Sequence, residues 1–200
     1  MRIAVIGAGN VGGALGAGFV RAGHEVVFGV RDPDSDKSRA AVAAAPGTRA
    51  DTPRVAVEGA DVVAFALRWD AVPVMVADIP SLEGRIVIDA MNRFDGDPAR
   101  STSEDLAELL PGARVVKAFN TIGFENLTSA RHRRHQAAMF VAGDDVEAKR
   151  VVMGLADELG FRPEDVGPLA NAKALEQMVR IWLALAERHG RDVGFAISDG

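Results

Sequence analysis

The sequence predicts an α/β protein: a doubly wound, mainly parallel β-sheet with a small helical cap at its C-terminal end. Nearly continuous apolar segments recur along the chain, segments with a helical spacing of apolar residues separate them, and a glycine-rich turn follows the first apolar segment. Short apolar runs of this kind are typical of strands that helices cover on both faces. The regular alternation of strands and helices then favours a parallel sheet.

The expected strands are apolar and comprise residues 2–6, 25–30, 61–67, 85–90, 114–119 and 137–142, with weaker candidates near 48–50 and 161–166. The expected helices lie between them, at 10–22, 36–45, 53–58, 70–79, 103–110 and 145–159. Asp144 or Asp145 is suited to cap the start of the last of these helices, and Gly160 is suited to end it.

A change of pattern after Pro168 divides the chain into two expected parts, residues 1–167 and residues 168–200. Residues 170–188 are expected to form one long helix with an apolar stripe of Leu175, Met178, Trp182 and Leu185. Its run 181–186 is apolar nearly all round, which predicts burial on several sides, against the same domain or a second subunit. We therefore expect a homodimer with this segment near the interface.

The composition excludes several classes of function. The chain has 200 residues, no cysteine and a formal net charge of −5. Lack of cysteine excludes disulfides, thiolate metal sites and a cysteine nucleophile, and a negative chain does not suit general nucleic-acid binding. These features fit a cytoplasmic protein.

Residues 3–20 contain one polar residue, Asn10, and their length alone would allow a membrane span. Six of these eighteen residues are glycine, so the segment is only weakly hydrophobic. It also divides into a short strand and a glycine-rich turn. We therefore expect no association with a membrane.

Gly7, Gly9 and Gly12 form a GxGxxG pattern directly after the first expected strand and at the start of the first expected helix. In a Rossmann-type fold the first glycine allows a tight turn, the second admits a pyrophosphate, and the third lets helix and strand pack closely. The N–H groups at the helix start then face the phosphates. A turn that only packs a helix on a strand is the alternative, and the strand–turn–helix context favours the nucleotide.

The segment FGVRDP at residues 28–33 concerns the choice between NAD and NADP. An NAD enzyme usually places a carboxylate after the second strand to bind the ribose hydroxyls, whereas a 2′-phosphate prefers a guanidinium. Here Arg31 comes first and Asp32 second. We interpret Arg31 as the 2′-phosphate contact, with help from Lys37 and Ser35, while Asp32 turns away or caps the next turn. A surface ion pair between Arg31 and Asp32 is the alternative.

The chain resembles the NADP oxidoreductases that depend on the deazaflavin coenzyme F-420 in the segments MRIAVIGAGNVGGALG, GHEVVFGVRDP, DVVAFALRWDAV, VVKAFNTIGFENL, AGDD and GPLANAKALE. The resemblance covers nearly the whole chain, and the combination of AFNT, AGDD and GPLANAKALE is its most specific part. The reductase domain of the six-helix membrane metalloreductases shares it. The resemblance implies that NADP lies along the C-terminal edge of the sheet and that an acceptor ring stacks on its nicotinamide.

The resemblance also implies roles for individual residues. Gly9, Asn10 and Val11 would hold the pyrophosphate, and Arg31 and Lys37 the 2′-phosphate. The residues that would lie along the ribose and nicotinamide are Ala66, Leu67, Arg68 and Trp69. Those that would line the hydride-transfer site are Ala90, Met91, Asn92, Asn120, Thr121 and Ile122.

The chain departs from the family pattern on the acceptor side. Residues 91–94 replace a small, proline-containing segment, and Arg68 replaces a proline. Gln177 and Val179 stand where small hydroxyl residues are expected. These departures leave the NADP half intact and leave the acceptor open among deazaflavin, flavin, quinone or another small molecule.

Hydride transfer between two stacked rings requires no dedicated acid, base or nucleophile. The chain has no tyrosine, and none of its four histidines lies in a proton-shuttle pattern, so we expect no catalytic side chain and no metal. Trp69 follows a strand at the ligand-binding edge, with a core role as the alternative. Asp89 and Asn92 stand at the same edge, where they serve either the ligand or the loop backbone.

The most basic run is residues 131–135, RHRRH. Its His132 and His135 lack a visible third metal ligand. A solvated loop is the simplest interpretation, and a surface that attracts an acidic tail of the acceptor is the sharper one.

Together these patterns predict an NADP-dependent oxidoreductase that transfers a hydride between NADPH and a planar acceptor such as coenzyme F-420. The partner is thus a small-molecule electron acceptor. One alternative is an NADPH-dependent reductase of flavin, quinone or another small acceptor, and a second is a dehydrogenase of small metabolites such as imines or hydroxy acids. A third is a redox sensor that binds NADP and transfers nothing.

Overall fold

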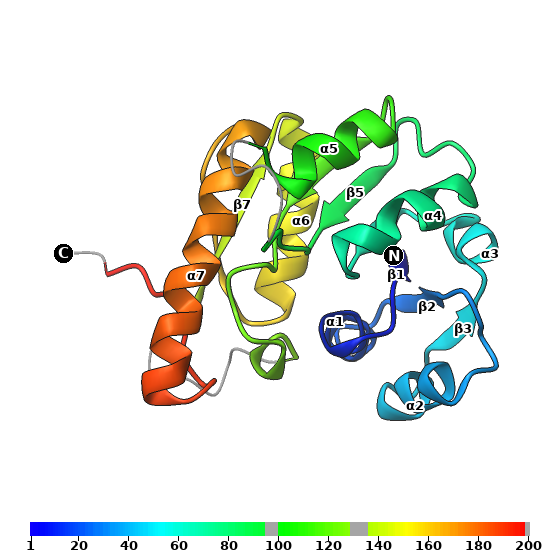
Figure 1. Ribbon diagram of the computed structural model, residues 1–200, viewed down its shortest axis with the longest axis horizontal. Coiled ribbons are helices and arrows are strands. Elements are labelled where there is room, and N and C mark those ends of the chain that lie inside the picture. The colour runs from blue at the N-terminus through cyan, green and yellow to red at the C-terminus, as the bar shows by residue number, and fades with distance from the viewer. Residues whose placement is uncertain (95–99, 129–135, 199–200) are drawn as a thin grey trace.

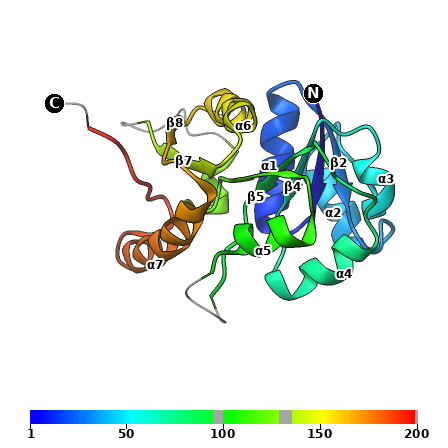
Figure 2. The same ribbon diagram turned by 90° about the horizontal axis from the view of Figure 1, so that it is seen from above.

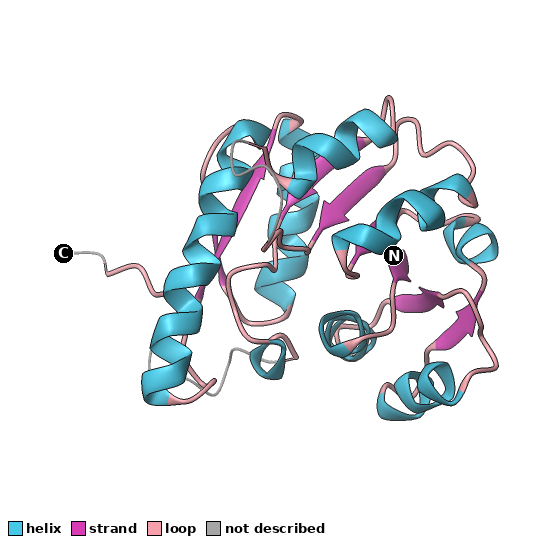
Figure 3. Ribbon diagram, viewed as in Figure 1, coloured by secondary structure: helices cyan, strands magenta, loops and turns pink. Residues whose placement is uncertain are grey.

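The computed structural model of the chain describes residues 1–94, 100–128 and 136–198. Strands and helices alternate along it (Figures 1 and 3). The strands are β1 (Arg2–Ile6), β2 (Glu25–Gly29), β3 (Arg49–Asp51), β4 (Val62–Phe65), β5 (Ile86–Asp89), β6 (Arg114–Lys117), β7 (Ala138–Gly143) and β8 (Arg162–Asp165). The helices are α1 (Asn10–Arg21), α2 (Asp36–Ala44), α3 (Pro53–Val57), α4 (Val72–Ala77), α5 (Thr102–Leu109), α6 (Val146–Glu158) and α7 (Ala172–His189). Three 3₁₀ turns join them: η1 (Trp69–Ala71), η2 (Phe124–Asn126) and η3 (Leu169–Asn171).

The strands form one sheet in the order β3-β2-β1-β4-β5-β6-β7-β8. Strands β1 to β6 run parallel to one another. Strand β7 is antiparallel to β6, and β8 is parallel to β7. The strand order reverses between β1 and β4, and open sheets of this type bind ligands outside the carboxyl ends of the strands at such a switch point.

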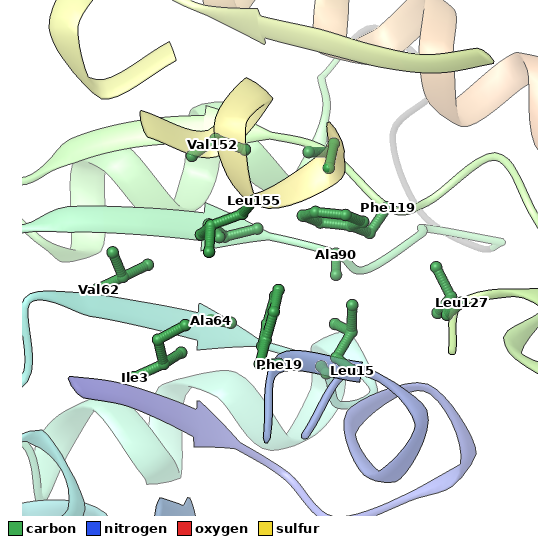
Figure 4. Packing of buried hydrophobic residues seen from close by; sticks show 14 of the residues in the cluster. Ile3, Leu15, Phe19, Val62, Ala64, Ala90, Phe119, Leu127, Val152 and Leu155 are labelled. Atoms are coloured by element: carbon green, nitrogen blue, oxygen red, sulfur yellow. The ribbon is translucent and has the colours of Figure 1, made fainter. Parts of the chain in front are cut away.

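Helices lie on both faces of the sheet (Figure 2). On one face, side chains of α1 and α6 pack with alternate residues of the central strands. Figure 4 shows part of this cluster, in which the rings of Phe19 and Phe119 lie edge to face with centroids 6.0 Å apart. On the other face, side chains of α3, α4 and α5 surround Phe65 and the second set of strand residues. Burial of both faces explains why the strands read as continuous apolar runs.

The predicted fold class is confirmed, and most elements lie within two residues of their expected bounds. The Asp145 side chain caps α6 by accepting a hydrogen bond from the N–H of Ala148, 2.7 Å away, and Gly160 follows the helix at a φ of 89°. The direction of β7 was not predicted, because a continuous apolar run carries no sign of its direction.

The buried face of α7 differs from the expected stripe. Leu175 and Trp182 are buried as expected and Met178 is half-buried, but the other buried members are Ala172, Glu176, Val179 and Ala186. Leu185 is exposed, and so are Ile181 and Leu183. The predicted stripe was misplaced because it was based on apolar residues alone. The structure also buries Glu176, which pairs with Lys117 and so turns this side of the helix inward.

Residues 3–20 divide between β1 and α1. No helix in the described part of the chain combines the length and the apolar character that crossing a lipid bilayer requires.

Candidate functional site at the carboxyl edge of the sheet

The turn between β1 and α1 is shaped by its three glycines. Gly7 has a φ of 104°, and a Cβ there would lie 2.7 Å from the carbonyl oxygen of Ala66. A Cβ on Gly12 would lie 2.0 Å from the carbonyl oxygen of Gly7, so this helix–turn contact requires glycine. A Cβ on Gly9 would meet no atom within 4 Å. Two glycines therefore serve close packing, while Gly9 borders open space.

The amino end of α1 faces this open space. Gly9 is the N-cap residue, and no side chain caps the helix. The first turn carries no acidic residue. Asn10 is exposed and Val11 half-buried at the first two positions. Because the first N–H groups of a helix lack intrahelical partners, this end of α1 is suited to an anion.

Arg31 follows β2 at the same edge and is exposed. No hydrogen bond or ion pair to another described residue occupies its guanidinium. It lines a pocket of about 330 Å³ together with Thr52, Pro53, Val74, Met75, Ala77 and Asp78. Lys37 is exposed in the first turn of α2, and it too has no partner in the described part of the chain. Two cations that no described residue pairs with therefore lie beyond β2.

Asp32 is engaged in shaping its own loop. Its Oδ1 accepts a hydrogen bond from the N–H of Asp34 at 3.0 Å. Its carbonyl oxygen accepts bonds from the hydroxyls of Ser35 and Ser38, at 3.0 and 2.7 Å. The Ser35 hydroxyl also caps α2 by accepting from the N–H of Ser38. The expected turn role of Asp32 fits this geometry, whereas Ser35 is occupied as a helix cap.

The segment after β4 lies across the glycine turn. Ala66 is buried and its carbonyl faces Gly7, while Leu67 is half-buried. Arg68 is exposed and pairs with Asp70 at 3.1 Å. The hydrogen bond from Arg68 outweighs the effect of burial and lowers the pKa of Asp70.

Trp69 is partly exposed, and its ring is stacked by a guanidinium. The Cζ atom of Arg93, from the loop after β5, lies 4.7 Å from the centroid of the Trp69 ring. Arg93 also forms an ion pair with Asp105, which pairs with Arg100 as well. Burial acts to raise the pKa of Asp105, but the hydrogen bonds from Arg93 and Arg100 outweigh it and lower the pKa below its usual value. Arg93 thus links Trp69, in the segment after β4, to the loop after β5.

Asn92 and Asn120 connect the loops after β5 and β6. Nδ2 of Asn120 donates to Oδ1 of Asn92 at 2.9 Å, and Nδ2 of Asn92 donates to the carbonyl oxygen of Asn120 at 3.0 Å. Nδ2 of Asn120 also donates to the carbonyl of Leu175 in α7, at 3.1 Å. Ala90, Met91, Thr121 and Ile122 are buried beside this pair. Phe119 has a φ of 63°, a conformation that costs energy in a non-glycine residue and is common at functional sites.

A buried charged cluster lies next to these loops, and the sequence analysis named only one of its members, Asp89, whose Oδ1 accepts from the loop N–H of Met91. Lys117, Asp89 and Glu176 are each at most 3% exposed. Nζ of Lys117 lies 3.1 Å from Oδ2 of Asp89 and 2.8 Å from Oε1 of Glu176. The sequence contains a signal for the Asp89–Lys117 pair, because these residues end two neighbouring apolar strands. In the sheet they face each other in register. Opposite charges at matching positions of two covered strands predict a buried pair.

The structure brings together at one edge the predicted residues after β1, β4, β5 and β6. Arg31 and Lys37 lie further along the same edge, beyond β2. Two residues of α7 depart from the family pattern: Val179 is buried and Gln177 is exposed. The basic run at 131–135 lies outside the described residues.

Comparisons with known proteins place the chain in a family. The model of the family described as NADP oxidoreductase coenzyme F420-dependent matches residues 2–93, from β1 to the loop after β5. The F420-dependent NADP reductase of Methanothermobacter thermautotrophicus is 30% identical over 225 residues, which cover 100% of this chain and 95% of that protein. Metalloreductase STEAP3 of Rattus norvegicus is 30% identical over 178 residues, which cover 88% of this chain.

The chain spans only 36% of the length of that metalloreductase. A crystal structure of a candidate F420-dependent NADP reductase from Arthrobacter sp. FB24 has a TM-score of 0.86 over 100% of both chains at 24% identity, which shows a shared fold. Family and fold agree with the glycine turn and the sheet edge described above. The chain therefore belongs to the family of coenzyme F420-dependent NADP oxidoreductases.

Proposed function

We propose that this protein transfers a hydride between NADPH and a planar acceptor such as the deazaflavin coenzyme F-420. The observation that carries the proposal is the combination of open space at Gly9 with a pocket-lining Arg31, unpaired among the described residues, at the same sheet edge. The names of two relatives support coenzyme F-420 as the acceptor, since both are F420-dependent NADP reductases.

The residues present fit an NADP molecule. The amino end of α1, with Gly7, Gly9, Asn10, Val11 and Gly12, would hold the pyrophosphate against backbone N–H groups. Arg31 and Lys37 would pair with the 2′-phosphate, which a guanidinium binds through two parallel hydrogen bonds. Asp32 would not compete for the ribose, because its carboxylate is held by its own loop.

The remaining predicted residues would surround the reacting ring. The ribose would lie along Ala66, Leu67, Arg68 and Trp69. The nicotinamide would be bordered by Met91, Asn92 and Asn120. When bound, NADPH would supply the hydride. The chain's own contribution would be to orient the ring at a reactive distance of about 3–3.5 Å from the acceptor and to exclude water. The side chains of Asn92 and Asn120 would fix the floor of this site, because each holds the other.

Binding is tested by titrating NADPH and NADH into the wild-type protein and Arg31→Ala. We expect the variant to lose about 10- to 100-fold in affinity for NADPH, the equivalent of one or two charged hydrogen bonds, with little change for NADH. Arg150→Ala is the matched control, because Arg150 is an exposed arginine that pairs with Glu147 on α6. An unchanged preference in Arg31→Ala, or a wild-type protein that binds neither dinucleotide, would contradict the proposal.

The acceptor is tested by following nicotinamide absorbance with a panel of deazaflavin, flavin and quinone acceptors. We expect turnover with the deazaflavin. Turnover with flavin or quinone alone would favour the broader reductase, and the exposed Arg68 and Gln177 are the departures from the family pattern that would explain it. Tight NADPH binding with no turnover of any acceptor would favour a redox sensor.

We further propose that the protein is a cytoplasmic homodimer in which residues 168–200 act as a cap and dimerisation segment beside the NADP-binding part, residues 1–167. The support is the exposed apolar character of α7, where Ile181 is 57% and Leu185 37% exposed. A large acceptor also needs more enclosure than one sheet edge offers.

A further inference from the structure

The buried cluster of Lys117, Asp89 and Glu176 holds the backbone of the loop after β5. Nζ of Lys117 donates to the carbonyl oxygen of Met91 at 2.7 Å. Oδ1 of Asp89 accepts from the N–H of Met91 at 2.9 Å, and Oε2 of Glu176 accepts from the N–H of Arg93 at 3.2 Å. The cluster therefore fixes the backbone on both sides of Asn92.

The cluster is tied to four separate elements. Lys117 ends β6, Asp89 ends β5, and Glu176 lies in the second turn of α7. Thr102, at the start of α5, donates its N–H to Oε1 of Glu176 at 2.8 Å, and its hydroxyl lies 2.6 Å from Oδ2 of Asp89. The hydroxyl of Ser103 donates to the same Asp89 oxygen at 2.6 Å. Two strands and two helices thus meet at one set of charges.

Asn92 is held through its side chain as well. Its amide pairs with Asn120, and Asn120 donates to the carbonyl of Leu175, the residue before Glu176. The second turn of α7 therefore supplies acceptors to both loops at the expected hydride-transfer site. Any shift of Glu176 would move the Met91–Arg93 backbone relative to Asn120.

We propose that Lys117 and Glu176 are positioning residues, which set the distance and angle of the nicotinamide ring by fixing the Met91–Arg93 loop against Asn120. This inference rests on the proposed function. Neither side chain would contact the substrates, because both are buried and are hydrogen-bonded to the loop backbone. Their effect passes through the backbone of Met91 and Arg93, where a displacement of a few tenths of an ångström changes the reactive geometry.

Glu176→Gln is the informative substitution because it keeps the size of the side chain. Whichever way the new amide is placed, its NH₂ group faces donors: the N–H of Arg93 on one side, or Nζ of Lys117 and the N–H of Thr102 on the other. The loop therefore loses either its direct bond at Arg93 or the acceptor that holds Lys117 and Thr102 beneath it. Lys117→Met is the stronger variant, but it leaves two buried carboxylates without a cation and therefore threatens folding.

Lys149→Met is the matched control. Lys149 is also buried, and its Nζ pairs with Asp165 at 2.8 Å. It joins α6 to β8, and it forms no hydrogen bond or ion pair with the described residues of the loop after β5. Its loss should lower stability without touching the proposed hydride site.

The experiment measures three quantities for each protein: the Kd for NADPH, the fluorescence lifetime of bound NADPH as a report on nicotinamide mobility, and kcat with the best acceptor of the panel. For Glu176→Gln we expect a Kd within about threefold of wild type, a shorter lifetime and a kcat lowered by about tenfold or more. Lys149→Met should lower the unfolding temperature while the lifetime and kcat stay near wild type.

Wild-type lifetime and kcat in folded Glu176→Gln would overturn the positioning role. Equal losses in Glu176→Gln and Lys149→Met would overturn it too, because they would reflect stability alone. The lifetime decides the matter even if no acceptor in the panel is turned over. Failure of the wild-type protein to bind NADPH would instead refute the proposed function, and the inference with it.

Discussion

The amides of Asn92 and Asn120 are hydrogen-bonded to each other across the carboxyl ends of β5 and β6, with 2.9 Å between Nδ2 of Asn120 and Oδ1 of Asn92. The pair joins two loops that are 28 residues apart in the chain. The same Asn120 group reaches α7 through the carbonyl of Leu175. The sheet edge and the C-terminal helix are therefore linked at one amide.

We expect this pair to be energetically coupled. A double-mutant cycle with Asn92→Ala and Asn120→Ala should give a coupling energy of about 0.5–3 kcal/mol in the free energy of unfolding, measured by urea denaturation. Asn120→Ala alone should cost more than Asn92→Ala, because it also leaves the Leu175 carbonyl without this donor. Simple additivity of the two single substitutions would contradict the prediction.

The glycines of the first turn should separate binding from folding. In Gly9→Ala the new methyl group meets no protein atom, so the variant should fold normally and lose about tenfold or more in NADPH affinity, because the methyl occupies the expected place of the pyrophosphate. Calorimetric titration and thermal unfolding measure the two effects.

Gly12→Ala is the counterpart, and its effect should fall on stability. Its methyl would lie 2.0 Å from the carbonyl oxygen of Gly7, so the helix and turn must move apart, at a cost of about 1–3 kcal/mol or more. A Gly12→Ala protein as stable as wild type would contradict the packing role of Gly12. Undiminished NADPH binding by Gly9→Ala would contradict the expected place of the pyrophosphate at Gly9.

Asp105 should contribute to acid sensitivity. Burial acts to raise its pKa, but Arg93 and Arg100 outweigh burial and hold the pKa below the ordinary value. A carboxyl group with a lowered pKa in the folded state stabilises the fold above the pKa of the unfolded chain, about 3.9, and this contribution is lost as the pH falls through the folded value.

The free energy of unfolding of wild type should therefore exceed that of Asp105→Asn at neutral pH, and the difference should shrink below about pH 4. Urea denaturation at a series of pH values checks this, with Asp157→Asn, an exposed carboxylate of α6, as the control. A pH-independent difference would mean that Asp105 acts through packing rather than charge.

The exposed face of α7 should control assembly. Ile181 and Leu185 lie one helical turn apart and are both exposed, so they share a face. We expect a wild-type dimer in sedimentation at micromolar concentration and a monomer for Ile181→Lys combined with Leu185→Lys. Val146→Lys, at an equally exposed apolar residue of α6, should remain dimeric. A monomeric wild-type protein would refute the dimer.

Much of the fold could be predicted because local patterns determine it. The strand β1, the glycine turn and α1 follow from an apolar run, three glycines and a helical spacing that all lie within twenty residues. The place of Arg31 at the sheet edge follows from the end of β2 in the same way. Such signals need no knowledge of distant contacts.

The remainder depended on contacts between distant segments. Glu176 lies 59 residues from Lys117, and nothing within α7 alone shows that a carboxylate belongs on its buried face. The antiparallel direction of β7 also depends on its partner rather than on its own residues. The pairing of Asn92 with Asn120 could be placed at one edge from the sequence, but its hydrogen bonds could not.

The loop after β2 keeps its shape without help from Arg31. Asp32, Ser35 and Ser38 bind one another, and the guanidinium next to them takes no part. Position 31 can therefore drift in evolution, or be redesigned, without unfolding its surroundings. With the role proposed for Arg31, a change of coenzyme preference would therefore be separable from the architecture that carries it.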